Sequence, residues 1–116
     1  MGSFRPQVVS SGVGTVSGGV VDIPLNPVAI GELMAVRITQ DVSGSFNLVI
    51  EDSRGYDILR GLGSGASGKD VSINANSVGG NPCQGQLTAK ITGATNGHVF
   101  AVDTYIKSNT QLRALA

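Results

Sequence analysis

Apolar and polar residues alternate with a two-residue period over much of the chain, which is typical of β-strands. The clearest case is residues 86–106, where LTAKIT (87–92) and VFAVDTYI (99–106) flank the polar break GATNGH. This break contains Asn96-Gly97, a dipeptide that readily reverses an antiparallel pair because both positions tolerate positive φ. The pattern predicts a long β-hairpin near the C-terminus.

A second alternating pair lies in the middle of the chain. Residues 33–39 (LMAVRIT) and 46–51 (FNLVIE) are separated by a short polar turn. In the first of these strands, Met34, Val36 and Ile38 are expected on one face. The spacing predicts a second β-hairpin.

The remaining segments are shorter. Strands are predicted at residues 19–25, 56–60 and 71–74, and loops at 61–69 and 75–85. No segment places apolar residues at helical spacing over three turns. About eight antiparallel strands at intervals near ten residues predict an all-β fold, a β-sandwich or jelly roll.

The N-terminal segment, residues 1–18, combines the apolar pair Val8-Val9 with a run of Ser, Gly and Thr. Such a segment buries little by itself, so it is expected either as an extended arm that orders against a partner or as an edge strand of its own domain. The chain is divided accordingly into an N-terminal arm (1–18) and a sandwich domain (19–116).

Composition agrees with strands joined by tight turns, because the chain has 17 glycines and only 14% charged residues. Eight acidic and eight basic residues are scattered along it without a run. No basic stripe for phosphate contacts is visible, so nucleic acid is not an expected partner. The apolar runs are far shorter than the roughly 20 residues of a spanning helix, so no membrane partner is expected either.

The glycine-rich loop contains two patterns associated with nucleotide binding. Residues 63–68 fit G-x-G-x-x-G, and residues 63–69 fit the first part of a phosphate-binding loop. Both motifs need a helix after the loop, whereas residues 71–74 are predicted as a strand. Asp70 also replaces the hydroxyl residue that would bind magnesium, so this segment is interpreted as a loop between strands.

Residues that could carry chemistry are few. His98 is the only histidine, and Cys83 is the only cysteine, so neither a histidine metal cluster nor an intrachain disulfide can form. Glu51, Asp52 and Asp57 flank one turn without the spacing of a dedicated calcium loop. We therefore expect no enzyme activity, no cofactor and no metal.

Two stretches resemble small jelly-roll structural proteins of tailed bacteriophage virions. They are residues 87–106, with L-T-A-K-I-T-G-A-T-N-G and V-x-T-Y-I, and residues 35–59, AVRITQDVSGSFNLVIEDSRGYDIL. The resemblance implies a capsid decoration or cement subunit, located in the virion and often a homotrimer. Its implied partner is the major capsid protein of an icosahedral shell or another virion protein.

The residues expected to contact such a shell lie near the ends of the chain: Phe4, Arg5, Val8, Val9, Leu112 and Leu115. An alternative is a carbohydrate-binding or receptor-binding module of a phage tail, whose feature would be an exposed Tyr56 or Tyr105 beside a polar loop. A hydrolase is the third reading, and it would need His98 and a carboxylate brought together in a cleft.

Overall fold

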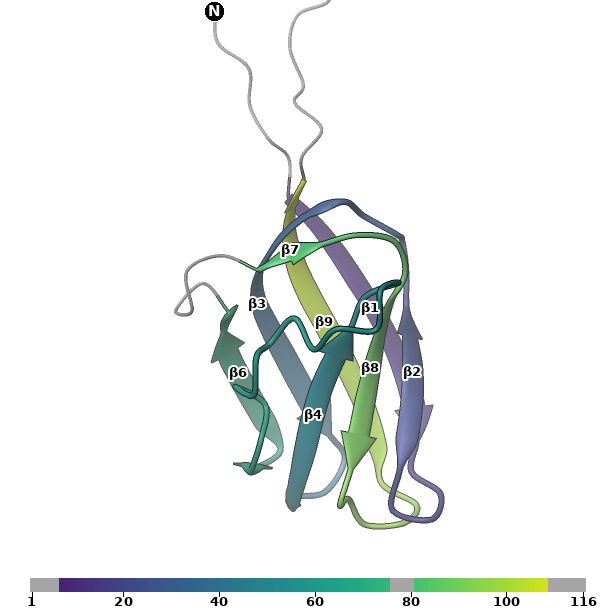
Figure 1. The fold of residues 1–116 in the computed structure, drawn as a ribbon. Helices are drawn as coiled ribbons and strands as arrows, with labels where there is room; N and C mark the ends of the chain where they lie inside the picture. The colour runs from purple at the N-terminus through teal and green to yellow at the C-terminus, as the bar shows by residue number, and fades with distance from the viewer. Residues whose placement is uncertain (1–6, 76–80, 109–116) are drawn as a thin grey trace, which may run out of the picture.

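The computed structural model describes residues 7–75 and 81–108 and contains two antiparallel β-sheets packed face to face (Figure 1). Its nine strands are β1 (Gln7–Thr15), β2 (Val21–Leu25), β3 (Gly31–Gln40), β4 (Ser45–Glu51), β5 (Ala66–Ser67), β6 (Asp70–Asn74), β7 (Pro82–Cys83), β8 (Leu87–Thr92) and β9 (Val99–Ser108). One sheet has the order β1-β9-β3-β6, with β7 added to β3, and the other has the order β2-β8-β4-β5. The all-β prediction is confirmed.

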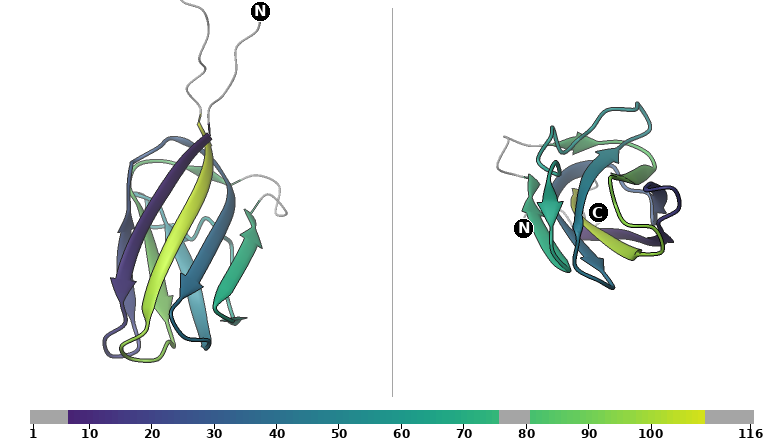
Figure 2. Two further views of the ribbon diagram at one scale, coloured as in Figure 1. Left: turned by 180° about the vertical axis from the view of Figure 1, so that it is seen from behind. Right: turned by 90° about the horizontal axis from the view of Figure 1, so that it is seen from below.

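The strands pair in a nested way, the outermost strands of the chain together and the middle ones together. β1 pairs with β9, β2 with β8, β3 with β6 and β4 with β5, while consecutive strands of the first half alternate between the sheets. This is a folded-over antiparallel ribbon, the arrangement of a double-sheet jelly roll. Figure 2 shows the first sheet from behind, with β1, β9, β3 and β6 side by side.

The core lies between the two sheets and is filled mainly by inward residues of β2, β3, β4, β8 and β9. Phe46 of β4 and Phe100 of β9 meet across it edge to face, with ring centroids 5.0 Å apart. Such a pair adds about 0.5–1.5 kcal/mol beyond the burial of its area. The largest fully buried side chains are Phe46, Phe100, Ile23, Leu25, Leu33, Ile38, Leu48, Ile50, Leu59, Leu87, Ile91 and Ile106.

Both predicted hairpins are wrong, although their strands are present. β8 and β9 belong to different sheets, and so do β3 and β4. The alternation pattern predicts which face of each strand is buried. It does not distinguish two strands that pair in one sheet from two strands that face each other across the core. The connection 93–98 is also long enough to cross the ~10 Å between packed sheets. Gly97 has a φ of 84°, but Asn96 is not among the residues with positive φ, so the hairpin turn expected from Asn-Gly is not formed.

The predicted strand at residues 56–60 is also wrong, because residues 58–60 are part of a run of turns that extends to residue 65. Only an isolated bridge between Glu51 and Asp57 extends the pairing of β4. Ile58 and Leu59 are both buried, so the two-residue period is broken at this point. Conversely, the predicted loops 61–69 and 75–85 contain the two-residue strands β5 and β7.

A register shift in β3 changes which of its residues face the core. The pairing with β9 is irregular between Leu33 and Ala35. Leu33 is fully buried and Met34 is only partly buried, so Leu33 takes the inward position expected for Met34. Val36 and Ile38 are buried as predicted.

Residues 7–15 form an edge strand rather than an arm. β1 pairs with β9 along its whole length, from Gln7 opposite Lys107 to Thr15 opposite Val99. The boundary placed after residue 18 is therefore wrong for this stretch, because it separates strands that share backbone hydrogen bonds. Residues 1–6 lie outside the described part of the chain.

Two glycines of β1 let the two sheets approach at this edge. A Cβ on Gly12 would lie 2.5 Å from the carbonyl oxygen of Pro24, and one on Gly14 would lie 2.8 Å from side-chain carbons of Val21 and Ile23. The Ser11 N–H donates to the Asn26 carbonyl (2.8 Å), and the Asn26 N–H donates back (3.0 Å). β1 and β2 thus close one side of the sandwich.

Candidate functional site

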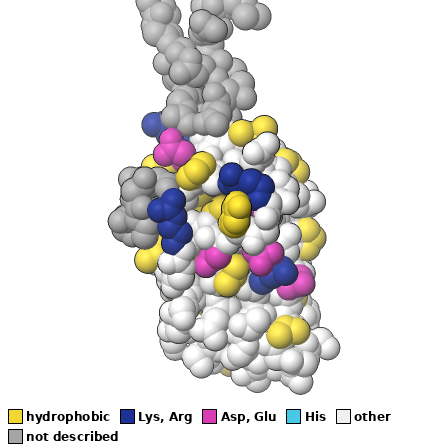
Figure 3. Space-filling model, viewed as in Figure 1, with side chains coloured by type: hydrophobic (Ala, Val, Ile, Leu, Met, Phe, Trp, Pro, Cys, Tyr) yellow, Lys and Arg dark blue, Asp and Glu magenta, His cyan; other side chains and the backbone are white. Residues whose placement is uncertain are grey.

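The two ends of the sandwich have different components. At one end, here called the terminal end, lie the loops 26–30, 52–62 and 81–86 and both ends of the described chain. At the other, the turn end, lie the turns 16–20, 41–44, 68–69 and 93–98. Figure 3 shows charged side chains on the upper and middle parts of the face in view, and a lowest part, toward the turn end, that is mostly neutral.

The first and the last described residues are neighbours at the terminal end. Gln7 pairs with Lys107, and Ser108 pairs with Gly31 of β3, so the two ends of the described chain lie side by side. This juxtaposition could not be read from the sequence, because it depends on the pairing of strands about 100 residues apart.

The structure describes two of the six residues that are expected to contact a shell, Val8 and Val9, and they differ in exposure. Val9 points away from the core and is 44% exposed, so it is available for contact. Val8 packs against the hydrophobic core, so its side chain is not available in the way expected. The other four, Phe4, Arg5, Leu112 and Leu115, lie outside the described residues.

Sequence reasoning missed two apolar residues at the same end. Val28 and Ile30 are each 54% exposed and belong to the loop between β2 and β3, one residue of which, Ala29, is buried. The Asn26-Pro27 turn predicted a loop here, but no local signal separates its buried residue from the exposed ones.

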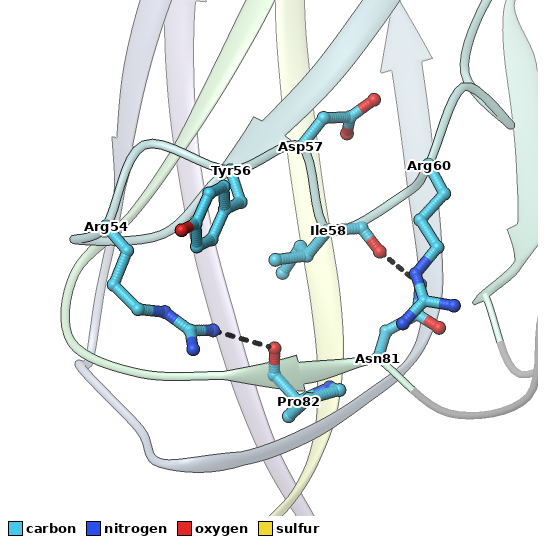
Figure 4. A pocket seen from close by; sticks show the side chains of 7 residues that line it. All are labelled: Arg54, Tyr56, Asp57, Ile58, Arg60, Asn81 and Pro82. Carbon is cyan, nitrogen blue, oxygen red and sulfur yellow. Dashed lines mark hydrogen bonds between the residues drawn. The ribbon is translucent and has the colours of Figure 1, made fainter.

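A pocket of about 250 Å³ opens between the loop 52–62 and β7 (Figure 4). It is lined by Arg54, Tyr56, Asp57, Ile58, Arg60, Asn81 and Pro82. Tyr56 is 63% exposed, which meets the feature named for the carbohydrate alternative. The guanidinium carbon of Arg54 lies 5.4 Å from the centroid of its ring, a cation–π contact.

The part of the pocket wall formed by Arg54 is held in place by the buried carboxylate of Asp52. Asp52 Oδ2 accepts hydrogen bonds from Arg54 Nε (2.9 Å) and Nη2 (2.6 Å), and Asp52 Oδ1 accepts one from the Arg54 backbone N–H (2.9 Å). The side chain of Asp52 is fully buried. Burial alone would raise the pKa of Asp52, but the hydrogen bonds and charge of Arg54 outweigh it, so the pKa lies below its usual value.

The part of the pocket wall formed by residues 57–61 is held in place by hydrogen bonds to its backbone. Asp57 accepts from the N–H groups of Leu59 (3.0 Å) and Gly61 (3.0 Å), and the Asn81 side chain donates to the Ile58 carbonyl. Arg60 has a φ of 52°, the only positive φ of a non-glycine residue in the described ranges. The wall therefore includes a residue in a conformation that favours glycine.

The carboxylates and the histidine considered from the sequence do not meet in one site. Glu51 pairs with Lys90 at 3.4 Å, Asp52 with Arg54, and Asp57 binds backbone N–H groups. His98 is at the turn end, with Nδ1 3.2 Å from Gln40 Oε1. Within residues 7–75 and 81–108, no group of three or more His, Cys, Asp or Glu side chains could hold a metal ion.

The glycine-rich loop and Cys83 both contribute to the packing and pairing of strands. The loop runs along the free edge of β4, where Gly63 accepts a hydrogen bond from the Leu48 N–H (2.8 Å), and it continues into β6 as expected. Cys83 is buried in β7, and this burial raises the pKa of its thiol. A thiol with a raised pKa is a poor nucleophile at neutral pH.

Comparisons with known proteins found no match: no protein-family model fits this chain, and no curated protein is similar to it in sequence. They give no link to the phage jelly-roll proteins. In the described part of the chain, no helix has the length and apolar character to cross a membrane.

Proposed function

We propose that this protein is a structural subunit of a virion, a decoration or cement protein that attaches to an icosahedral shell by its terminal end. The observation that carries the proposal is the pairing of Gln7 with Lys107, which brings both terminal segments to one point. A double-sheet jelly roll is also an architecture that viral capsid domains use.

Two segments that start together can engage one partner surface together. The second segment then binds at the high effective concentration set by the first, which strengthens attachment without new contacts. Fully extended, residues 1–6 reach at most about 20 Å and residues 109–116 about 28 Å. Phe4, Leu112 and Leu115 are therefore within reach of a shell on which the terminal end sits.

Apolar side chains beside these segments extend the proposed contact. Val28 and Ile30 are exposed in the loop that leads into β3, whose first residue pairs with Ser108. Fully burying such a side chain contributes about 1.5–3 kcal/mol. The proposed partner is a major capsid protein or another virion protein. The proposed assembly is a homotrimer, as the resemblance to phage decoration proteins implies, and symmetric neighbours would add stability by mass action.

Deleting residues 1–6 tests the attachment. The deletion leaves all of the described strands intact, so we expect an unchanged melting temperature together with loss of co-sedimentation with virus particles from the culture that produces the protein. Val28→Asp with Ile30→Asp should weaken the same association. The matched control is Val20→Asp with Val42→Asp, two valines that are 50% and 51% exposed at the turn end.

The result that contradicts the proposal is full co-sedimentation of the truncated protein, or equal loss in the turn-end control. Light scattering gives the native mass, and a value near the 11.8 kDa of one chain would contradict the trimer.

A further inference from the structure

We propose that the pocket between Arg54 and Arg60 binds an uncharged pyranose sugar. This site goes beyond the attachment to a shell and does not depend on it, because none of its lining residues belongs to the terminal segments or to the loop 26–30. Its ligand class follows from the aromatic ring, the balance of charges and the rigidity of the walls.

Tyr56 supplies the flat apolar surface that stacks on a sugar ring. It is the most exposed aromatic side chain of the described residues, at 63%, and Arg54 lies over its ring. Figure 4 shows Tyr56 and Ile58 between the two arginines, with Pro82 along the opposite edge. The volume of about 250 Å³ is below the roughly 300 Å³ at which pockets for drug-sized molecules begin, so it suits one small ring.

The charges around the pocket cancel. Arg54 is paired with the buried Asp52, and the lining residues Arg60 and Asp57 carry opposite charges. No net field therefore favours an anionic ligand. Guanidinium groups are rich in N–H donors, so the two arginines offer hydrogen bonds to the hydroxyl oxygens of a sugar.

The walls are already held in place without a ligand. Asp52 fixes the side chain and the backbone of Arg54, Asp57 fixes the turn that leads to Arg60, and Asn81 ties this turn to the strand β7. A pre-organised site loses less conformational entropy when a ligand binds, which matters for a ligand as small and as well solvated as a sugar.

Arg60 gives an independent reason to assign a binding role to this wall. Its φ of 52° lies in the left-handed region, which costs a non-glycine residue about 1–2 kcal/mol. Glycine would adopt this conformation without strain. The strained arginine therefore indicates that its side chain is useful in the pocket wall.

An NMR titration of the labelled full-length chain tests the proposal, with glucose, galactose and N-acetylglucosamine as neutral probes and glucuronate as the charged comparison. We expect saturable shifts, for at least one neutral probe, that are confined to the amides of residues 54–61, 81 and 83. Tyr56→Ala should weaken this binding about tenfold, since the aromatic contact is lost. Arg60→Gly should also weaken it while the melting temperature stays equal or rises.

The matched control is Arg37→Gln, which changes an exposed arginine of β3 that does not line the pocket and pairs with Asp70, and it should leave the titration unchanged. Three outcomes would overturn the proposal: no saturable shift with any neutral probe, binding of glucuronate alone, or an unchanged affinity in Tyr56→Ala. Because Tyr56 and Arg60 are exposed, their variants are expected to fold, and a melting curve of each verifies this.

Discussion

The two ends of the sandwich expose similar aliphatic side chains but differ in how their polar groups are used. Val20 and Val42 at the turn end are as exposed as Val28 and Ile30 at the terminal end. Aliphatic exposure therefore does not distinguish the ends. The terminal end adds an exposed tyrosine, a pocket and both chain termini, and these features support its proposed contacts.

At the turn end, polar side chains bind neighbouring turns. Gln40 Nε2 donates to the carbonyls of Gly44 (2.9 Å) and Gly68 (2.7 Å), and Gln40 Oε1 lies 3.2 Å from the His98 ring. Asn96 Oδ1 accepts from the Gly19 N–H at 2.8 Å. These polar groups form hydrogen bonds within the molecule. A polar cluster that includes the only histidine of the chain can therefore serve to connect turns.

The largest effect on stability is expected from a substitution that pushes the loop 61–69, which connects the two ends, away from β4. A Cβ on Gly63 would lie 2.3 Å from the carbonyl oxygen of Leu48 in β4, a backbone atom that cannot move aside cheaply. We expect Gly63→Ala to lower the free energy of unfolding by about 3 kcal/mol, measured by urea denaturation. Gly44→Ala is the control, because its Cβ has no neighbour closer than 3.7 Å and its φ is not positive. Equal stability of the two variants would contradict this packing.

A smaller effect is expected from the buried carboxylate at the terminal end. Asp52→Asn should lower the free energy of unfolding at pH 7 by about 1.5 kcal/mol, the lower range for hydrogen bonds to charged groups, because solvent screens the half-exposed Arg54. The folded-state pKa of Asp52 is lowered, so its stabilisation is present above the unfolded value of about 3.9 and is lost as the pH falls through the folded value.

Urea denaturation of both proteins between pH 7 and pH 2 measures this dependence. The difference between wild type and Asp52→Asn should be constant above about pH 5 and shrink below about pH 4. A difference in the free energy of unfolding that grows on acidification would contradict the lowered pKa of Asp52.

The smallest effects compare hydrogen bonds at the two ends. Gln40→Ala removes two donated hydrogen bonds at a buried position and should cost about 1–2 kcal/mol. Ser53→Ala removes one exposed bond, from Ser53 Oγ to the Gln84 carbonyl, and should cost about 0.5 kcal/mol or less. Thermal melts of both variants check this order, and a larger loss in Ser53→Ala would reverse the comparison of the ends.

The candidate site was only partly predictable from the sequence. The sequence suggests Tyr56 or Tyr105 as the exposed tyrosine of a sugar-binding module and Val9 as a contact residue. Tyr56 and Val9 are exposed, whereas Tyr105 is only partly exposed. The approach of Asn81 and Pro82 to the loop around Tyr56 had no local signal, since these segments are more than 20 residues apart. The left-handed conformation of Arg60 has no sequence signal either, because glycine and asparagine are the residues that usually occupy such positions.

The amino-acid sequence alone predicts which side of β4, β8 and β9 faces the core, and it fails only near the irregular start of β3. Leu87, Ala89 and Ile91 are buried as their alternation predicts, because the direction of a side chain in a strand depends only on the local two-residue period. Three features are visible only in the folded molecule: which strands pair, that the first and last described residues are neighbours, and which loops form a pocket. These depend on contacts such as that between Gln7 and Lys107, and the alternation pattern is equally satisfied by a hairpin and by two strands in opposite sheets.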